Sequence, residues 1–192
     1  FAKMNLAMQL TLKGTPCLYQ GDELALTEAD LPYEALQDPV GITFWPESKG
    51  RDGCRTPMPW RSDVAHAGFS VATPWLPVPV EHFSLAVSEQ EKDADSVLQF
   101  SRRIIQWRKS IPQLLRGEIQ FYDMPEPILA LRRDLAGAPS VLVMFNLGNE
   151  AVEIEWPDAE HAIVLSGHGL PGQKSGKQIT LPAYGAWFGL QR

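Results

Sequence analysis

Several features that assign proteins to functional classes are scarce in this chain of 192 residues. Its 17 basic side chains are outnumbered by 23 acidic ones, which gives a formal net charge of −6. Nucleic acids and anionic membranes are bound by basic faces, so we expect neither as a partner. No apolar run approaches the roughly 20 residues that a membrane-spanning helix needs, so we expect no membrane segment.

Residues that form cross-links or bind metals are also few. Cys17 and Cys54 are the only cysteines, and with no CxxC or Cys/His spacing they fit neither a disulfide framework nor a zinc site. We therefore expect two free thiols in a reducing compartment. None of the four histidines has a partner at ligand spacing, so we expect surface or loop positions, no metal and no cofactor; they are His66, His82, His161 and His168.

An initiator methionine and a signal peptide are missing as well. The sequence begins at Phe1, and Lys3 is followed by an amphipathic stretch rather than by the apolar core of a leader. We expect a piece of a longer protein that is located in the cytoplasm. The periplasm is the alternative, because a leader would lie upstream.

The residues that are present describe an ordinary globular protein, with 44% hydrophobic and 21% charged side chains. Residues 1–13 are apolar on most sides and rich in helix formers, which predicts a buried helix that ends at Gly14. The short apolar run 15–20 predicts a buried strand, and polar residues follow it abruptly up to Glu23. Together these elements are half of an α/β unit whose strand has no parallel neighbour in this chain.

Residues 24–91 are dense in proline and aromatic side chains. Proline-rich stretches without aromatics are usually linkers. Here we expect the tryptophans to give the segment its own packing. Structured loops longer than about 15 residues tend to be functional, so we expect a functional loop.

The remainder of the chain predicts one helix followed by a small β-domain. Apolar residues at helical spacing predict a helix over 95–110, limited by Pro112. After Gly117 the period changes to two, which predicts a boundary between residues 1–116 and 117–192 and a small antiparallel sandwich. Its expected strands are 118–122, 128–133, 140–146, 151–156, 162–165, 178–181 and 186–190.

The segment 50–60 carries the most distinctive charge pattern. Arg51 and Arg55 flank a glycine turn, with Asp52 between them. The arginines could pair with Asp52 and hold the shape of the loop. Alternatively, their planar forks could be directed at a carboxylate or a sugar hydroxyl.

Two motifs resemble the α-amylase family of glycoside hydrolases (family 13). Residues 14–23 fit that family's G-x-P-x-x-Y-x-G-x-E pattern around the eighth barrel strand, and 50–60 contains R-D-x-x-R-T-P-M-x-W. The second motif, together with residues 28–46, resembles the C-terminal part of bacterial α-glucosidases and oligo-1,6-glucosidases. The resemblance is strong up to residue 110 and mostly architectural after it.

The resemblance implies an α+β fragment: the last helix–strand–helix part of a (β/α)8 barrel followed by a C-terminal antiparallel β-sandwich. Active sites of such barrels lie at the carboxyl ends of the strands. The resemblance therefore implies that 24–91 is the loop after strand eight, above the sugar pocket. It also implies that Arg51, with Arg55 as second choice, binds substrate at the +1 sugar, and that Glu23 and Asp52 shape the site.

The catalytic carboxylates of the family are absent from this sequence. A retaining glycosidase uses two carboxyl groups about 5–5.5 Å apart, as nucleophile and acid/base. In the family these follow strands four and five, and a third acid lies in an Asn-His-Asp run after strand seven. The sequence contains neither Asn-His-Asp nor Gly-Phe-Arg-x-Asp. We expect a chain that is inactive alone, with an α-linked glucose oligosaccharide as the parent enzyme's substrate.

Three alternatives remain open. A transglycosylating relative, such as a sucrose isomerase or trehalose synthase, keeps the same motifs. Amino-acid transporter heavy chains resemble the family without catalysing. The sandwich could also be a carbohydrate-binding module, although its aromatics alternate with polar residues and are expected in a core. In each case the exposed surface of a lone barrel segment would require the missing barrel half, self-association, or the packing of the first segment around the chain's own sandwich.

Overall fold

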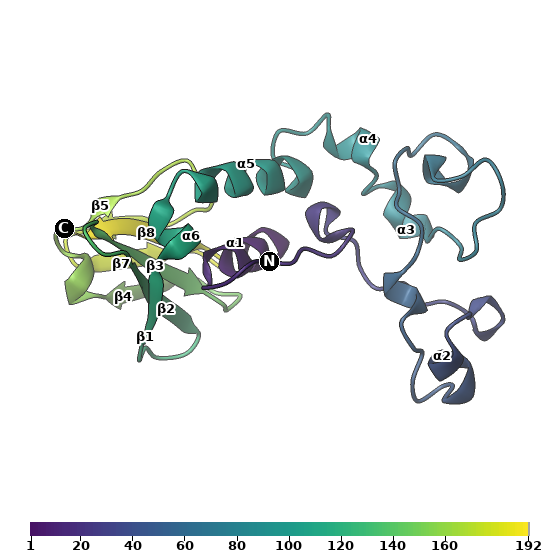
Figure 1. The fold of residues 1–192 in the computed structure, drawn as a ribbon, viewed down its shortest axis with the longest axis horizontal. Helices are drawn as coiled ribbons and strands as arrows, with labels where there is room; N and C mark the ends of the chain where they lie inside the picture. The colour runs from purple at the N-terminus through teal and green to yellow at the C-terminus, as the bar shows by residue number, and fades with distance from the viewer. Residues whose placement is uncertain (192) are drawn as a thin grey trace. The chain divides into compact units, whose positions relative to one another are not determined.

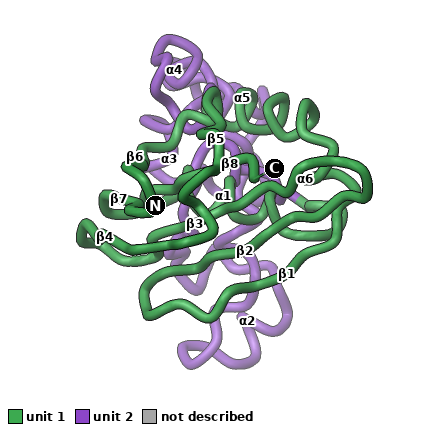
Figure 2. Tube along the Cα trace, turned by 90° about the vertical axis from the view of Figure 1, so that its left-hand side faces the viewer, with its two compact units in different colours: residues 1–17, 100–192 green, residues 18–99 purple. Residues whose placement is uncertain are grey.

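The computed structural model describes residues 1–191 and divides the chain into two compact units. Unit 1 contains residues 1–17 together with those from 100 onward, and unit 2 contains residues 18–99 (Figures 1 and 2). Each unit has its own core of buried apolar side chains.

Unit 1 is built around two antiparallel sheets. The larger has the strand order β1-β2-β3-β8-β5, and the smaller has the order β4-β7-β6. The strands are β1 (Glu118–Tyr122), β2 (Ile128–Asp134), β3 (Ser140–Asn146), β4 (Val152–Glu155), β5 (Ile163–Val164), β6 (Gln173–Ser175), β7 (Gln178–Leu181) and β8 (Ala186–Gln191).

Alternate residues of the strands form the core of the sandwich. Leu142 and Met144 of β3 belong to it, together with Ile179 and Leu181 of β7 and Trp187 of β8. Because successive side chains of a strand point to opposite faces, this alternation leaves the other half of β3 and β8 for the opposite face of the large sheet. The expected antiparallel sandwich is therefore present.

Helices contact that opposite face of the large sheet. They are α1 (Ala2–Thr11), α5 (Val97–Lys109) and α6 (Pro112–Arg116). Trp107 of α5 meets Phe188 of β8 edge to face, with ring centroids 4.8 Å apart, and Phe188 also contacts Phe145 of β3. Since β3 is covered on both sides, its side chains are buried from Val141 to Asn146.

The expected strands of unit 1 agree with the structure to within one or two residues at each end, and one further strand, β6, was not expected. The helix expected over 1–13 spans Ala2–Thr11, and the one expected over 95–110 spans Val97–Lys109. The strand expected over 15–20 is wrong for this structure, because that segment is extended but pairs with no strand among residues 1–191.

The expected core positions of the sandwich aromatics are largely confirmed. Trp156, Trp187 and Phe188 are buried, whereas Phe121 is 55% exposed. The expectation that the histidines lie in loops or at the surface is wrong for His82, which is 1% exposed and lies in the helix Val80–Phe83. His168 lies in a loop as expected but is only 7% exposed. His82 contacts the carbonyl of Thr27, and His168 packs against the rings of Trp107 and Phe188.

Unit 2 contains short helical turns and long connections. Its α-helices are α2 (Pro39–Thr43), α3 (Val80–Phe83) and α4 (Val87–Gln90). Its 3-10 turns are η1 (Asp22–Leu24), η2 (Tyr33–Ala35), η3 (Asp52–Cys54) and η4 (Ala65–Gly68). The buried side chain of Gln90 links η1, the connection between α3 and α4, and the start of α5: it donates to the carbonyls of Leu24 and Leu85 and accepts from the N–H of Leu98.

Packing in unit 2 differs from the expectation that tryptophans would provide it. Its core consists of aliphatic side chains, with Trp45 only partly buried against them: Ala29, Leu31, Leu36 and Leu76. Trp60 and Trp75 are 50% and 70% exposed. The aliphatic cluster therefore supplies the packing that was expected of the tryptophans.

The two compact units do not follow the expected boundary between residues 116 and 117, because helices α1 and α6 belong to the same unit as the sheets. A division into barrel and β-domain at that position stays a prediction. No helix within residues 1–191 has the length and apolar character needed to cross a membrane. Both cysteines are free and exposed.

Candidate functional site

Of the two motifs singled out in the sequence, residues 14–23 extend from unit 1 into unit 2, and residues 50–60 lie in unit 2, where they form a tight turn. Residues 50–55, which we call the arginine turn, begin with Gly50 at φ +68° and continue through η3. The N–H of Arg55 donates to the carbonyl of Asp52 at 2.9 Å and closes the turn. A left-handed backbone of this kind favours glycine, which explains the residue at its start.

Asp52 is fully buried and holds this turn against a neighbouring segment. Its Oδ2 accepts hydrogen bonds from the backbone N–H groups of Gln37 and Asp38, at 2.6 and 2.7 Å. Its Oδ1 has no hydrogen-bond partner within the described residues. The sequence left open that Arg51 and Arg55 pair with Asp52. In the structure Asp52 binds the backbone N–H groups of Gln37 and Asp38 instead.

Asp38, which sequence analysis did not assign to the site, is the carboxylate that Arg51 contacts. It caps α2 by accepting from the N–H of Val40, and its Oδ2 accepts from the N–H of Arg51 at 2.9 Å. The Nε of Arg51 lies 3.6 Å from the same oxygen. The hydrogen bonds from the Val40 and Arg51 backbones, and then the charges of Arg51 and Arg55, hold the pKa of Asp38 below its usual range.

The two arginines differ in exposure and in partners. The side chain of Arg51 is 70% exposed beyond its contact with Asp38, whereas Arg55 is half-buried. Within residues 1–191, the Arg55 guanidinium forms no hydrogen bond or ion pair. A guanidinium without a partner can offer parallel donors to vicinal sugar hydroxyls or to a carboxylate.

Glu23 follows the extended segment 15–20 and stabilises its own turn. Its Oε2 accepts from the N–H of Gly21 at 2.9 Å, and Gly21 has φ +97°. The neighbouring Asp22 accepts from the N–H of Tyr19 at 2.8 Å. Both carboxylates therefore fix the backbone at the end of the first motif.

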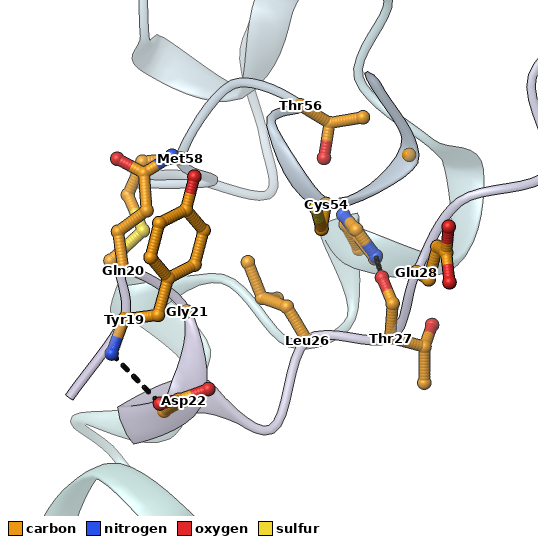
Figure 3. Close-up of a pocket in the computed structure, with 12 residues that line it drawn as sticks. Tyr19, Gln20, Gly21, Asp22, Leu26, Thr27, Glu28, Cys54, Thr56 and Met58 are labelled. Atoms are coloured by element: carbon orange, nitrogen blue, oxygen red, sulfur yellow. Dashed lines mark hydrogen bonds between the residues drawn. The ribbon is translucent and has the colours of Figure 1, made fainter. Parts of the chain in front are cut away.

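The structure brings the two motifs together around one small pocket (Figure 3). Its volume is about 80 Å³, and its walls come from both motifs, from the segment 26–28 and from α3: Tyr19, Gln20, Gly21, Asp22, Leu26, Thr27, Glu28, Gly53, Cys54, Thr56, Met58 and His82. Typical ligand pockets hold roughly 300–1,000 Å³. A sugar ring therefore needs further walls beyond those that this unit provides.

None of the four site residues expected from the sequence lines this pocket. Arg51, Arg55, Glu23 and Asp52 lie behind or beside its walls, in the same two motifs. Sequence reasoning missed the lining residues His82 and Thr27, which are joined by a 3.0 Å hydrogen bond between Nε2 and the carbonyl oxygen. No sequence pattern could have identified them, because they are 55 residues apart.

The arrangement offers hydrogen-bond donors and turn-forming carboxylates, but no metal cluster. Within residues 1–191 no three His, Cys, Asp or Glu side chains are grouped so as to hold a metal ion. The carboxylates described above are engaged by backbone N–H groups. They can shape a site, and the arginines can bind a polar ligand.

Comparisons with known proteins agree with the motifs. The model of the alpha amylase catalytic domain matches residues 1–117. A probable alpha-glucosidase of Rhizobium meliloti (strain 1021) is 46% identical over 187 residues, which cover 97% of this chain and 33% of that protein. A probable oligo-1,6-glucosidase 2 of Bacillus subtilis (strain 168) is 30% identical, over 87% of this chain and 34% of that protein.

Solved structures give the same result. The alpha-glucosyl transfer enzyme XgtA matches with a TM-score of 0.94 and 44% identity, over 100% of this chain and 35% of that one. A trehalose-6-phosphate hydrolase of Bacillus licheniformis matches with a TM-score of 0.86 and 26% identity, over 100% of this chain and 38% of that one.

The chain spans about a third of the length of these relatives. The likenesses confirm the expected fold class, the last part of a (β/α)8 barrel followed by an antiparallel β-sandwich. With both motifs meeting at one pocket and most of its length matched by the family model, the chain belongs to the α-amylase family of glycoside hydrolases.

Proposed function

We propose that this chain is the C-terminal part of a retaining α-glucosidase that hydrolyses terminal α-glucosidic bonds of short oligosaccharides. The observation that carries the proposal is the 46% identity to a probable alpha-glucosidase across 97% of the chain. The pocket between the two motifs supports it, because it places the arginine turn beside the carboxyl end of the extended segment 15–20.

Within that enzyme the chain borders the sugar pocket. Arg51 and Arg55 bind the sugar at the +1 position, where the fork of a guanidinium matches neighbouring hydroxyl groups. Glu23 and Asp52 shape the site through the backbone N–H groups that they bind. An enzyme of this kind, which acts on small soluble sugars, would work in the cytoplasm.

The carboxylates that carry out the reaction lie outside this chain in the proposal. Retention requires a nucleophile and an acid/base about 5–5.5 Å apart. Asp38, Asp52 and Glu23 each accept hydrogen bonds from backbone N–H groups, so these carboxylates hold turns in shape rather than face a sugar. The chain alone is therefore inactive, and it depends on the rest of a barrel or on self-association to cover its exposed apolar surface.

Transglycosylation is a second candidate, favoured by the 44% identity to an alpha-glucosyl transfer enzyme. A retaining enzyme forms a covalent glucosyl intermediate, and the acceptor that reaches it decides the product. Water gives hydrolysis, whereas a second sugar gives transfer. The ratio of free glucose to new oligosaccharide, measured with maltose, separates the two candidates.

A chimera tests the proposal. In it, this chain replaces the matching segment of the Rhizobium relative. We expect the chimera to hydrolyse an aryl α-glucoside and maltose. Replacing Arg51 or Arg55 with alanine should lower kcat/KM for maltose on the order of 10-fold, and lower that for the aryl glucoside less.

Arg61→Ala is the matched control for these arginine variants. Arg61 is an exposed arginine of the same unit and pairs with Asp63 rather than with the turn. A folded chimera without activity would contradict the proposed function. Unchanged kinetics in both Arg51→Ala and Arg55→Ala would contradict their place at the sugar.

A further inference from the structure

We propose that Asp38 is a positioning residue for the arginine turn, and that it controls which sugars the enzyme accepts by acting through Arg51 and Arg55. The inference rests on the proposed function and deepens it. It assigns a role to a buried carboxylate in α2's N-cap, outside both motifs, that does not line the pocket.

The arginine turn and the segment before α2 are joined by a reciprocal pair of contacts. Asp52 of the turn accepts N–H groups from Gln37 and Asp38, and Asp38 in return accepts the N–H of Arg51. Each carboxylate binds the backbone that carries the other. Displacing either segment therefore breaks hydrogen bonds at both, and the turn can occupy only one position relative to α2.

The backbone of the arginine turn also packs very closely against its neighbours at three glycines. A Cβ placed on Gly41 would lie 2.5 Å from the carbonyl oxygen of Lys49, and one on Gly50 would lie 2.8 Å from the nitrogen of Gly41. A Cβ on Gly53 would lie 2.5 Å from the carbonyl oxygen of Ala29, whose N–H donates to Gly53 at 3.0 Å. The backbones touch on two sides of the turn, so it has no free space into which to relax.

Asp38 and Arg51 also differ sharply in how far their side chains are buried. The carboxylate side chain is 4% exposed, while that of the arginine is 70% exposed. Asp38 therefore holds the backbone of Arg51 through its N–H and lies 3.6 Å from the Nε of its side chain. Most of the Arg51 side chain stays in solvent. Both oxygens of Asp38 are already in use, so its effect on a sugar passes through the arginines.

The first test measures hydrogen exchange in the unmodified chain. The amide of Arg51 lies at an exposed residue of a turn, yet we expect it to exchange at least about tenfold more slowly than in an unstructured peptide, because it donates to Asp38. Exchange at the unstructured rate would overturn the proposal. This measurement requires no enzymatic activity, so it holds or fails independently of the proposed function.

The second test is a double-mutant cycle in the chimera. Asp38→Asn removes the charge and leaves one oxygen for two N–H donors. We expect it to lower kcat/KM for maltose relative to the aryl glucoside on the order of 10-fold, and to have no further effect on that ratio once Arg51 and Arg55 are alanine. Asp63→Asn, which breaks an exposed pair in the same unit, is the control and should leave the ratio unchanged.

The cycle separates positioning from a merely structural role. If Asp38→Asn changes the maltose ratio equally with and without the two arginines, Asp38 does not act through them and the proposal is wrong. The proposal is also wrong if Asp38→Asn leaves the ratio of kcat/KM for maltose to that for the aryl glucoside unchanged. If Asp38→Asn fails to fold, the exchange rate of the Arg51 amide in the unmodified chain decides the question.

Discussion

Asp52 and Asp38 are 14 residues apart in the sequence, yet each contacts the backbone beside the other. The sequence placed Asp52 between two arginines, and proximity along the chain favoured a local ion pair. In the fold, Asp52 is fully buried and meets the requirement of a buried carboxylate for hydrogen bonds through the N–H groups of Gln37 and Asp38 instead. The sequence could predict a shaped turn here, but not which groups shape it.

Replacing Asp52 with alanine should lower the free energy of unfolding by about 1–3 kcal/mol, because the N–H of Asp38 would be left buried without an acceptor. Asp52→Asn keeps an acceptor oxygen and should cost less. Urea denaturation of both variants measures the difference. Asp63→Ala, at an exposed ion pair, is the control, and an Asp52→Ala loss no larger than the control's would contradict this account.

His168 introduces a pH dependence into unit 1. It packs against both Trp107 and Phe188, its Nδ1 accepts from the N–H of Leu170, and burial lowers its pKa to about 4. Its pKa when unfolded is 6.5, so the unfolded chain binds the proton first and stability falls as the pH drops from 6.5 towards 4.

The loss attributable to His168 should reach up to about 3 kcal/mol near pH 4 and be absent above pH 7. His168→Gln should remove this part of the pH dependence. Denaturation midpoints at pH 7.5 and 4.5 measure it, with His161→Gln, at an exposed histidine, as control. The same loss of stability in His168→Gln and in the unmodified chain would show that another group titrates.

Among the elements, those with a strong pattern could be predicted, and those without one could not. Most strands after residue 117 alternate apolar and polar residues between turn residues. β3 is a continuous apolar run instead, and it matches its expected range of 140–146. β6 was missed because Gln173–Ser175 contains no apolar residue and pairs only with β7. The strand prediction for residues 15–20 was wrong for the opposite reason. The composition suits a strand, but a strand also needs a neighbouring strand to pair with.

The C-terminus of α1 depends on a buried arginine. Arg133 of β2 is fully buried and donates to the carbonyls of Thr11 and Gly117, and burial lowers its pKa. Carbonyls at a helix C-terminus favour cations and have no partner within the helix. Sequence reasoning did not predict this contact, because it joins residues 122 positions apart.

Arg133→Met should therefore destabilise unit 1 by about 1–3 kcal/mol, since two carbonyls lose their donor. The amides of α1 should exchange faster with solvent in the same variant. Arg116→Met, at an exposed arginine in the last turn of α6, is the matched control. If Arg133→Met leaves the thermal midpoint and the α1 exchange rates at the control's values, Arg133 does not hold the helix end.

For the whole molecule, the family could be recognised from its two motifs, and the comparisons confirm it. The position of the arginines relative to a sugar could not be derived in the same way. A pocket of about 80 Å³ is only part of a binding site, and the chain spans about a third of its relatives. The central claim is therefore that this chain borders a sugar site whose reacting carboxylates lie elsewhere.

The most direct measurement compares two preparations on one aryl α-glucoside: the purified, folded chain and the chimera with the Rhizobium relative. We predict no turnover by the chain alone and clear turnover by the chimera, because in the proposed function the two reacting carboxylates lie in the part that the relative supplies. Turnover by the chain alone that disappears when one of its own acids is replaced would contradict the account.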